Sequence, residues 1–473
     1  LHKYNLFNNL MKNQKLNLTK DSIPNLAIKM AVPVSIGFFF HTMFNVVDIY
    51  FASKISSVAV ASIALTFPIY LMIITISRGT REGATALIAN AEGSNDKILA
   101  KKYLVQTVSF SVIASFVIMI IGILSASYLF NLLHASGDYF NFAVQYINII
   151  FYGCIFIILD STPTAGLNAV GDTKTYSNTF IIGFFINLIL DPLFIYGYGP
   201  IPAMGVKGIA YATIAAEFAA TIYVFYRLKK ITDYFDNITF IDFIPKLKYQ
   251  IDILKQAFPA SLNMLCIASG FFIVTFFVSF FPTQETSSTS VAAYGIALRI
   301  EQIILLPAIG LNFACLTLTG QNFGAMKYDR IREGFLTCLK YGLILMLIGG
   351  LIIFFGSNYF MGIFTNDLNV IEIGANYLKI SALFIPAFTI LQISISFMQG
   401  IKKPIHTTFI SLFKEVVGAA IIFWLLCFYL NHKLQGLWFG ILIINYLSMI
   451  IFLFIVNLKM KTLGIEIFKI KQQ

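Results

Sequence analysis

Two pairs of an asparagine and an aspartate stand inside apolar stretches of this chain of 473 residues. Asn45 precedes Asp48 by three residues in FNVVDIYF, and Asn187 precedes Asp191 by four residues in FINLILDPLF. Residues three or four apart share one face of a helix, so each amide can point toward the same place as its carboxylate. The oxygen atoms of these groups suit a small cation, and a poorly hydrated carboxylate can instead carry a proton. The pairs therefore predict a binding site for Na⁺ or H⁺.

A proline supports the second pair. Pro192 has no N–H, so the carbonyl group of Leu188, one turn earlier, loses its usual hydrogen-bond partner and becomes a further oxygen ligand. An alternative stays open, in which Asp48 and Asp191 lie at helix ends near lipid headgroups, where a carboxylate costs little. This alternative is stronger for Asp48, which is close to the predicted end of its apolar stretch.

Other ionisable residues also fall within apolar stretches, where each costs about 2.5–3.5 kcal/mol at the centre of a membrane helix on insertion scales. We take Asp160, together with Asn45, as a further candidate for the lining of a polar cavity. The remaining charges of this kind are Arg78, Arg81, Glu82, Glu217, Arg299, Glu301, Lys414 and Glu415.

The elements that hold these residues must be membrane helices. Hydrophobic residues make up 58% of the chain and charged residues 12%, and the mean hydropathy is +0.81. A soluble fold cannot hide so much apolar surface, whereas a bilayer solvates it. Stretches such as 109–123 and 341–355 contain no ionisable group, and similar runs recur along the chain. An all-α polytopic membrane protein is therefore expected.

We predict twelve transmembrane helices, with short turns rich in glycine, asparagine and aspartate between them. An even number of spans places both ends of the chain on the same side of the membrane. The predicted spans are 25–51, 57–78, 103–131, 139–168, 175–198, 206–228, 250–281, 288–318, 333–357, 370–399, 404–429 and 434–458.

Lysine and arginine are distributed unequally between alternate connecting segments. One side of the predicted membrane has only Lys54, Lys207 and Lys433, while the other has basic residues in every connection. This bias predicts that both termini are cytoplasmic, in the cytoplasmic (inner) membrane of a bacterium. The net charge of +11 is then a signal of topology, and we expect no nucleic-acid partner. No removable signal peptide is expected either. The basic residues of the predicted cytoplasmic side include Lys3, Lys12, Lys15, Lys20, Lys97, Lys101, Lys102, Lys174, Arg227, Lys229, Lys230, Lys327, Arg330, Lys402, Lys403, Lys459, Lys461, Lys469 and Lys471.

The two halves of the chain repeat each other at a distance of roughly 230 residues. The segment 79–93 aligns with 310–324, and 171–181 aligns with 400–410. Six spans in each half predict two pseudo-symmetric six-helix bundles, related by an axis along the membrane normal, with a cavity between them. The predicted domains are an N-lobe (1–228), a cytoplasmic linker (229–249) and a C-lobe (250–473).

Cysteine and histidine give no indication of a metal centre or an enzyme. The chain has five cysteines and five histidines, scattered singly, without a CxxC pair or a metal-binding pair of histidines. We expect no metal site other than a Na⁺ site, no disulfide and no cofactor. An intramembrane enzyme would need facing catalytic side chains, and only Asp48 and Asp191 could serve. Because a two-fold repeat is typical of transporters, we expect a transporter and not an enzyme. A passive channel is not expected either, since the sequence has no short filter motif that could form a ring.

Five motifs occur in the order found in the multidrug and toxic compound extrusion (MATE) family, and together they resemble it over nearly the whole chain. They are NVVDIYFA at 45–52, the turn with Glu92 and Asp96, the Gly-Asp-Thr-Lys turn at 171–174, N-x-x-x-D-P at 187–192 and GIAYAT at 208–213. The NorM-like branch has acidic residues in its seventh and tenth spans. Here 258–281 and 377–397 contain none, so the resemblance is closer to the DinF-like branch.

This resemblance implies a secondary antiporter that exports organic cations, drugs and other amphiphilic compounds in exchange for H⁺ or Na⁺ by alternating access. It places Asp48, Asn187 and Asp191, with Thr213, around the coupling ion in the N-lobe, and Na⁺ would bind at the first three. Membrane lipids would surround a monomer. The nearest alternative is a flippase for a lipid-linked oligosaccharide or another lipid-like substrate of the same superfamily.

Overall fold

The computed structural model describes residues 16–132, 136–281 and 287–465. Within these ranges the chain is helical apart from its connections, and the only strand-like pairing is an isolated bridge between Tyr198 and Ile201. Twelve helical segments in the described ranges are long and apolar enough to cross a membrane. The prediction of an all-α polytopic membrane protein with twelve spans is confirmed.

The N-terminal half contains seven helices in the described ranges, followed by one short 3-10 helix. They are α2 (Ile23–Ile55), α3 (Ser57–Gly93), α4 (Lys97–Leu132), α5 (Gly137–Leu159), α6 (Ser161–Ala169), α7 (Lys174–Tyr196), α8 (Val206–Ile231) and η1 (Phe240–Phe243).

The C-terminal half has the same order of long helices. Two π-helical segments lie in the eleventh span of the chain. The elements are α9 (Leu247–Ser279), α10 (Ser287–Gly324), α11 (Tyr328–Gly362), α12 (Leu368–Gly400), α13 (Ile405–Leu412), η2 (Phe413–Val417), α14 (Gly418–Trp424), η3 (Leu425–Tyr429) and α15 (Lys433–Thr462).

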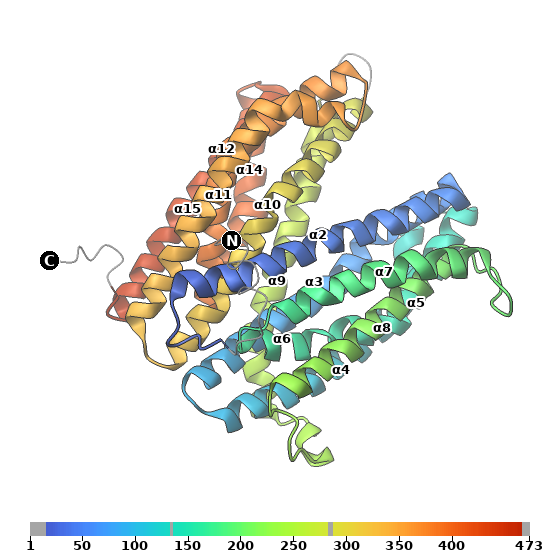
Figure 1. The fold of residues 1–473 in the computed structure, drawn as a ribbon. Helices are drawn as coiled ribbons and strands as arrows, with labels where there is room; N and C mark the ends of the chain where they lie inside the picture. The colour runs from blue at the N-terminus through green and yellow to red at the C-terminus, as the bar shows by residue number, and fades with distance from the viewer. Residues whose placement is uncertain (1–15, 133–135, 282–286, 466–473) are drawn as a thin grey trace, which may run out of the picture.

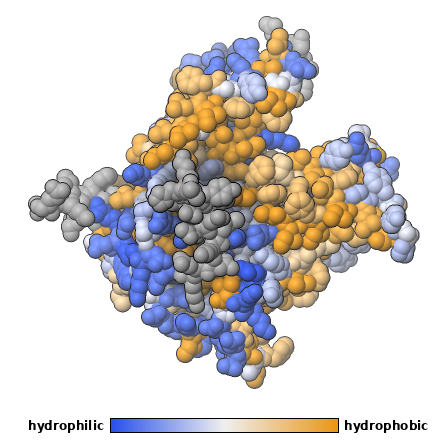
Figure 2. Space-filling model, viewed as in Figure 1, coloured by the Kyte–Doolittle hydropathy of each residue, from blue (hydrophilic) through white to orange (hydrophobic). Residues whose placement is uncertain are grey.

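The helices form two bundles that meet at one end and diverge at the other (Figure 1). Helices α2–α8 make up the N-lobe and α9–α15 the C-lobe, and the lobes contact each other through α3 with α9, α2 with α10, and α3 with α10. We call the end with the turns 94–96 and 325–327 the closed end, and the end with the connections 197–205 and 363–367 the open end. A hollow separates the lobes toward the open end in the space-filling view (Figure 2).

The backbone of the turns at the closed end confirms the internal repeat. Asn95 follows α3 with a φ of 62°, and Met326 follows α10 with a φ of 54°. Likewise Gly171 precedes α7 with a φ of 87°, and Lys402 precedes α13 with a φ of 59°. The alignment made from the sequence placed Gly171 over Gly400, whereas the backbone places Gly171 over Lys402. That part of the sequence alignment is therefore shifted by two residues from the structural one. The glycine at 171 and the lysine at 402 hide this equivalence because their side chains differ completely.

Two spans depart from the prediction in shape. The predicted span 139–168 is broken at Asp160, between α5 and α6. Pro163 is the cause we infer, because its missing N–H leaves the carbonyl group of Leu159, one turn earlier, without a helical partner. The predicted span 57–78 continues as helix to Gly93, since 79–93 packs between the two lobes and is not a connection.

The surface separates an apolar belt from a polar end. Apolar side chains cover both diverging lobes, and polar side chains gather around the closed end (Figure 2). Exposed large apolar residues on the outer helices include Leu124, Ile189, Phe355 and Phe454, as expected for a surface in contact with lipid. The predicted basic positions Lys3, Lys12, Lys15, Lys469 and Lys471 lie outside the described residues.

Candidate functional site

Asp48, Asn187 and Asp191 meet inside the N-lobe. The Nδ2 atom of Asn187 donates hydrogen bonds to Oδ1 of Asp48 and to Oδ2 of Asp191, the latter over 3.2 Å. Asp48 is 7% exposed, and Asn187 and Asp191 are fully buried. Both carboxylates therefore lie inside the protein, and the alternative of two exposed acids at helix ends does not describe the structure. One amide joins two carboxylates that come from two helices.

The sequence of α7 directs its two polar residues to the same place. Gly183, Asn187, Asp191 and Ile195 are all buried, and a spacing of four residues keeps them on one face of the helix. This face packs against α2, which supplies Asp48. The i,i+4 spacing seen in the sequence thus produces the predicted contact.

An apolar cluster closes the site on the side of the open end. Ala52 lies one turn beyond Asp48 on α2, and Ile195 lies one turn beyond Asp191 on α7. Both belong to a buried cluster with Val206 and Ile209 of α8. A site shielded from water in this way strengthens the electrostatic interactions of its carboxylates.

Thr213 and Tyr146 complete the surroundings. Thr213 on α8 is 1% exposed and donates from Oγ1 to the carbonyl oxygen of Ile209 over 3.0 Å, and its side chain also lies beside the carboxyl group of Asp48. Tyr146 on α5 is 5% exposed, lies against Thr213 and faces both carboxylates. Sequence reasoning missed Tyr146, because one tyrosine among 23 carries no distinctive spacing.

Two buried oxygen atoms of the site have no partner. Oδ1 of Asn187 and Oδ1 of Asp191 accept no hydrogen bond in the described part of the chain. Neither Asp48 nor Asp191 forms a salt bridge with any described residue. The carboxyl groups of Asp48 and Asp191 also lie against each other. An unpaired buried carboxylate is costly, so when both acids are ionised their negative charge has no compensating cation among the described residues. Na⁺, which prefers oxygen ligands, and H⁺ both fit this donor set.

The other two predicted residues lie elsewhere. Asn45 is half-buried, and its Nδ2 donates to the carbonyl oxygen of His41 in its own helix over 2.9 Å. Asp160 stands at the break between α5 and α6, where its Oδ2 accepts from Thr164 over 3.3 Å and its Oδ1 has no partner among the described residues. The structure gives neither residue a bond to Asp48, Asn187 or Asp191.

The C-lobe holds its own buried charges. Glu301 on α10 is 7% exposed, and its Oε2 accepts hydrogen bonds from Tyr377 over 2.8 Å and from Ser381 over 2.5 Å. Lys414 forms a salt bridge with Glu415 within η2, and its ammonium group lies 5.2 Å from the ring centre of Phe388. Each of these charges has a partner in the protein.

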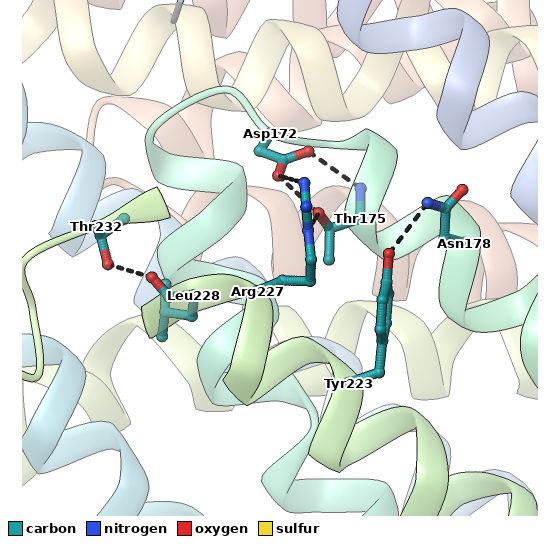
Figure 3. Close-up of polar contacts among 7 residues, drawn as sticks. All are labelled: Asp172, Thr175, Asn178, Tyr223, Arg227, Leu228 and Thr232. Carbon is teal, nitrogen blue, oxygen red and sulfur yellow. Dashed lines mark hydrogen bonds and ion pairs between the residues drawn. The ribbon is translucent and has the colours of Figure 1, made fainter. Parts of the chain in front are cut away.

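A cavity of about 1360 Å³ opens at the closed end, away from the acidic site. Its lining comes from both lobes and carries more basic than acidic side chains, among them Lys20, Lys101 and Lys230. Figure 3 shows part of its wall, where Asp172 accepts from the backbone N–H of Thr175 over 3.0 Å and pairs with Arg227 over 3.8 Å. These contacts fasten the turn before α7 to α8.

Comparisons with known proteins extend over most of the chain. The family model described as MatE matches residues 33–193 and 259–424. A probable multidrug resistance protein, YoeA of Bacillus subtilis, is 26% identical over 389 residues, covering 81% of this chain and 82% of that protein. An FAD transporter of Shewanella oneidensis is 24% identical, covering 84% and 86%. A probable multidrug resistance protein NorM of Thermotoga maritima is 25% identical, covering 93% and 92%.

Solved structures match the fold just as widely. An outward-facing conformation of a multidrug resistance MATE family transporter is similar with a TM-score of 0.87 at 23% identity, covering 96% of this chain and 99% of the other. A transporter of the MOP superfamily from Pyrococcus furiosus is similar with a TM-score of 0.88, also at 23% identity and with the same coverage. At this level of identity the likeness concerns the fold.

Proposed function

The chain belongs to the MatE family and is a multidrug-efflux transporter of the membrane, not an enzyme, and from this premise we propose that it is a secondary antiporter. It exports organic cations and other amphiphilic compounds by alternating access, in exchange for H⁺ or Na⁺. The observation that carries this proposal is the site of Asp48, Asn187 and Asp191, in which two buried oxygen atoms lack a partner.

A cation at this site would act on two helices at once. Two carboxylates close together in a poorly hydrated place repel each other, and a bound positive ion removes that repulsion. Asp48 belongs to α2, while Asn187 and Asp191 belong to α7. Because α2 packs both on α7 and on α10 of the C-lobe, ion binding can change how the two lobes fit together.

The orientation follows from the distribution of charge. We propose that the closed end faces the cytoplasm, with both termini on that side, because its connections carry the basic residues that cytoplasmic loops favour. The open end then faces outward. On this view the protein lies in the cytoplasmic membrane of a bacterium as a monomer among lipids, with an N-lobe of 1–228, a linker of 229–249 and a C-lobe of 250–473.

The class of exported compound rests on the relatives. Proteins named for multidrug resistance stand beside one named as an FAD transporter. These names favour export of small organic compounds over the flipping of a lipid-linked oligosaccharide. We propose that the space between the diverging lobes receives the compound and releases it on the outer side.

Transport by purified protein in liposomes tests the proposal. Efflux of a cationic dye is measured with an imposed Na⁺ gradient and, separately, with an imposed H⁺ gradient, and one of the two gradients should drive it. Replacing Asp48→Asn or Asp191→Asn should abolish the gradient-driven component. Asp138→Asn serves as the matched control, because Asp138 is an exposed acid at the start of α5.

Two results would refute the proposal. If both aspartate variants transport like the unmodified protein, the acidic site has no part in coupling. If neither gradient drives export of any cationic dye, the protein is not an antiporter of this kind.

A further inference from the structure

Two glycines bring α3 and α10 into backbone contact at the closed end. A Cβ atom added to Gly93 would lie 1.9 Å from the carbonyl oxygen of Gln321, and one added to Gly324 would lie 1.9 Å from the carbonyl oxygen of Asn90. No larger residue fits either position without separating the helices. Glycine permits such close approach between helices in membranes.

The same segments exchange hydrogen bonds between the lobes. Nδ2 of Asn90, in the N-lobe, donates to the carbonyl oxygen of Gly400, in the C-lobe, over 3.0 Å. Nε2 of Gln321, in the C-lobe, donates to the carbonyl oxygen of Ala169, in the N-lobe, over 2.7 Å. Asn90 is 5% exposed and Gln321 is 8% exposed.

These contacts are pairs under the internal repeat. The alignment of 79–93 with 310–324 places Asn90 over Gln321 and Gly93 over Gly324. The two accepting carbonyl groups also correspond, since Ala169 precedes Gly171 by two residues as Gly400 precedes Lys402, and these turns are equivalent. Each lobe thus contributes one close-packed glycine and one side-chain amide, and each amide donates to a carbonyl group of the other lobe.

We propose that Asn90, Gly93, Gln321 and Gly324 form a two-fold latch that holds the closed end shut. The inference rests on alternating access in the proposed function, because the closed end must open when the transporter faces the cytoplasm. Opening would separate the two helices, break both inter-lobe hydrogen bonds and expose the amides to water. The four residues then set the balance between the two conformations without touching ion or substrate.

The expected effects differ between amides and glycines. One intramolecular hydrogen bond has a modest net value, so removing both with Asn90→Ala and Gln321→Ala should raise the ratio of inward-open to closed protein about tenfold. Each single variant should give a smaller shift of the same sign. Gly93→Ala and Gly324→Ala should shift the ratio further, because an added methyl group prevents the backbone contact and with it both hydrogen bonds.

Distances between spin labels at both ends provide the test. One pair replaces the exposed residues Lys97 and Lys403 at the closed end, and a second pair replaces the exposed Ser57 and Asn431 at the open end. Pulsed electron spin resonance on the full chain in liposomes then gives both distance distributions. In the latch variants, the closed-end distance should lengthen while the open-end distance shortens.

Matched variants separate the latch from general loss of packing. Asn445→Ala removes a buried amide whose hydrogen bond stays within α15. Gly295→Ala adds a methyl group to α10 where no atom lies within 4 Å. Both should leave the two distributions unchanged, and the latch variants should elute from a sizing column like the unmodified protein.

Two results would overturn the latch. In one, the latch variants give the same distributions as the two controls. In the other, both ends broaden together, which would mean that the residues only support packing. The measurement needs neither substrate nor ion gradient, so a failure of the latch can be told apart from a failure of the proposed antiport.

Discussion

The two lobes repeat one arrangement of helices but treat buried charge in opposite ways. In the N-lobe, Asp48 and Asp191 share a single amide and form no salt bridge with a described residue. In the C-lobe, Glu415 is paired with Lys414, and Glu301 accepts two hydroxyl hydrogen bonds. The two acids of the N-lobe site therefore lack a partner cation among the described residues, as the proposed ion coupling requires, whereas these acids of the C-lobe have partners in the protein.

The corresponding helices of the C-lobe meet in an apolar cluster. Where the N-lobe brings α2, α7 and α8 together around its acids, the C-lobe brings α9, α14 and α15 together around Val274, Phe423 and Ile441. The same backbone thus supports either a polar site or a hydrophobic cluster. What distinguishes an ion site is the excess of acidic over basic groups, which the fold alone does not determine.

The largest effect is expected at the N-lobe site. Asp191→Asn should weaken binding of the coupling ion about 100-fold or more, because loss of one partner from a buried charge contact costs several kcal/mol. Titration calorimetry with Na⁺, and proton release measured in weakly buffered solution, would show the loss. Thermal stability should stay the same or rise, since the repulsion between two acids is removed. A clear loss of stability would contradict an uncompensated site.

A smaller effect, on stability, is expected from breaking the C-lobe pair. Lys414→Met leaves Glu415, whose side chain is only 16% exposed, without its cation, which should cost about 3 kcal/mol. The melting temperature in detergent should fall, while ion binding stays normal. Adding Glu415→Gln in the same chain should restore most of the loss. If Lys414→Met instead abolished ion binding, the contrast between the lobes would be wrong.

A still smaller change should follow at the second C-lobe acid. Tyr377→Phe removes one of two hydroxyl groups that donate to Glu301 and should cost about 1.5 kcal/mol, the usual value for a hydrogen bond to a charged group. The melting temperature should fall by less than in Lys414→Met. Titration of the coupling ion provides the control, because its affinity should not change.

The smallest effect is expected in the connection between the lobes. The backbone and side chain of Thr239 donate to Asp242 over 3.0 Å in η1 and hold the pKa of this carboxyl group below its ordinary value. A lowered pKa in the folded state means that the carboxylate stabilises η1 above the ordinary pKa and ceases to do so as the pH falls through the lowered one. The protection factor of the Thr239 amide, which compares its exchange rate with that of an unstructured peptide at the same pH, should therefore fall in acid, and Asp242→Asn should remove this dependence. Transport should be unaffected.

Much of the acidic site was visible in the sequence. Asp48 and Asp191 stood out because charge is expensive in an apolar helix, and the four-residue spacing of Asn187 and Asp191 placed both on one face. The three-residue spacing of Asn45 and Asp48 does not produce a hydrogen bond between them. Its amide donates to the carbonyl group of His41, one turn back in its own helix. Spacing alone cannot exclude this local hydrogen bond.

Contacts between distant segments were the part that sequence reasoning could not reach. The repeat aligned Asn90 with Gln321. Their spacing in the sequence did not predict that each amide would donate a hydrogen bond to a carbonyl group in the opposite lobe. Tyr146 joins the acidic site from a fourth helix, α5, and Phe423 belongs to the apolar cluster between the corresponding helices of the C-lobe. Such partners depend on how bundles dock, which periodicity does not encode.

Helix α2 is a member of both the acidic site and the boundary between the lobes, since it carries Asp48 and packs on α10. In the proposed antiport, a cation that binds at Asp48 would therefore act on the boundary between the lobes through α2 alone. This single helix of 33 residues, with Pro33 inside it, carries Asp48 at one point along its length and contacts the C-lobe at another. Substitutions that interrupt helix α2 between these two points should uncouple ion binding from the movement of the lobes, while the affinity for the ion and the fold stay unchanged.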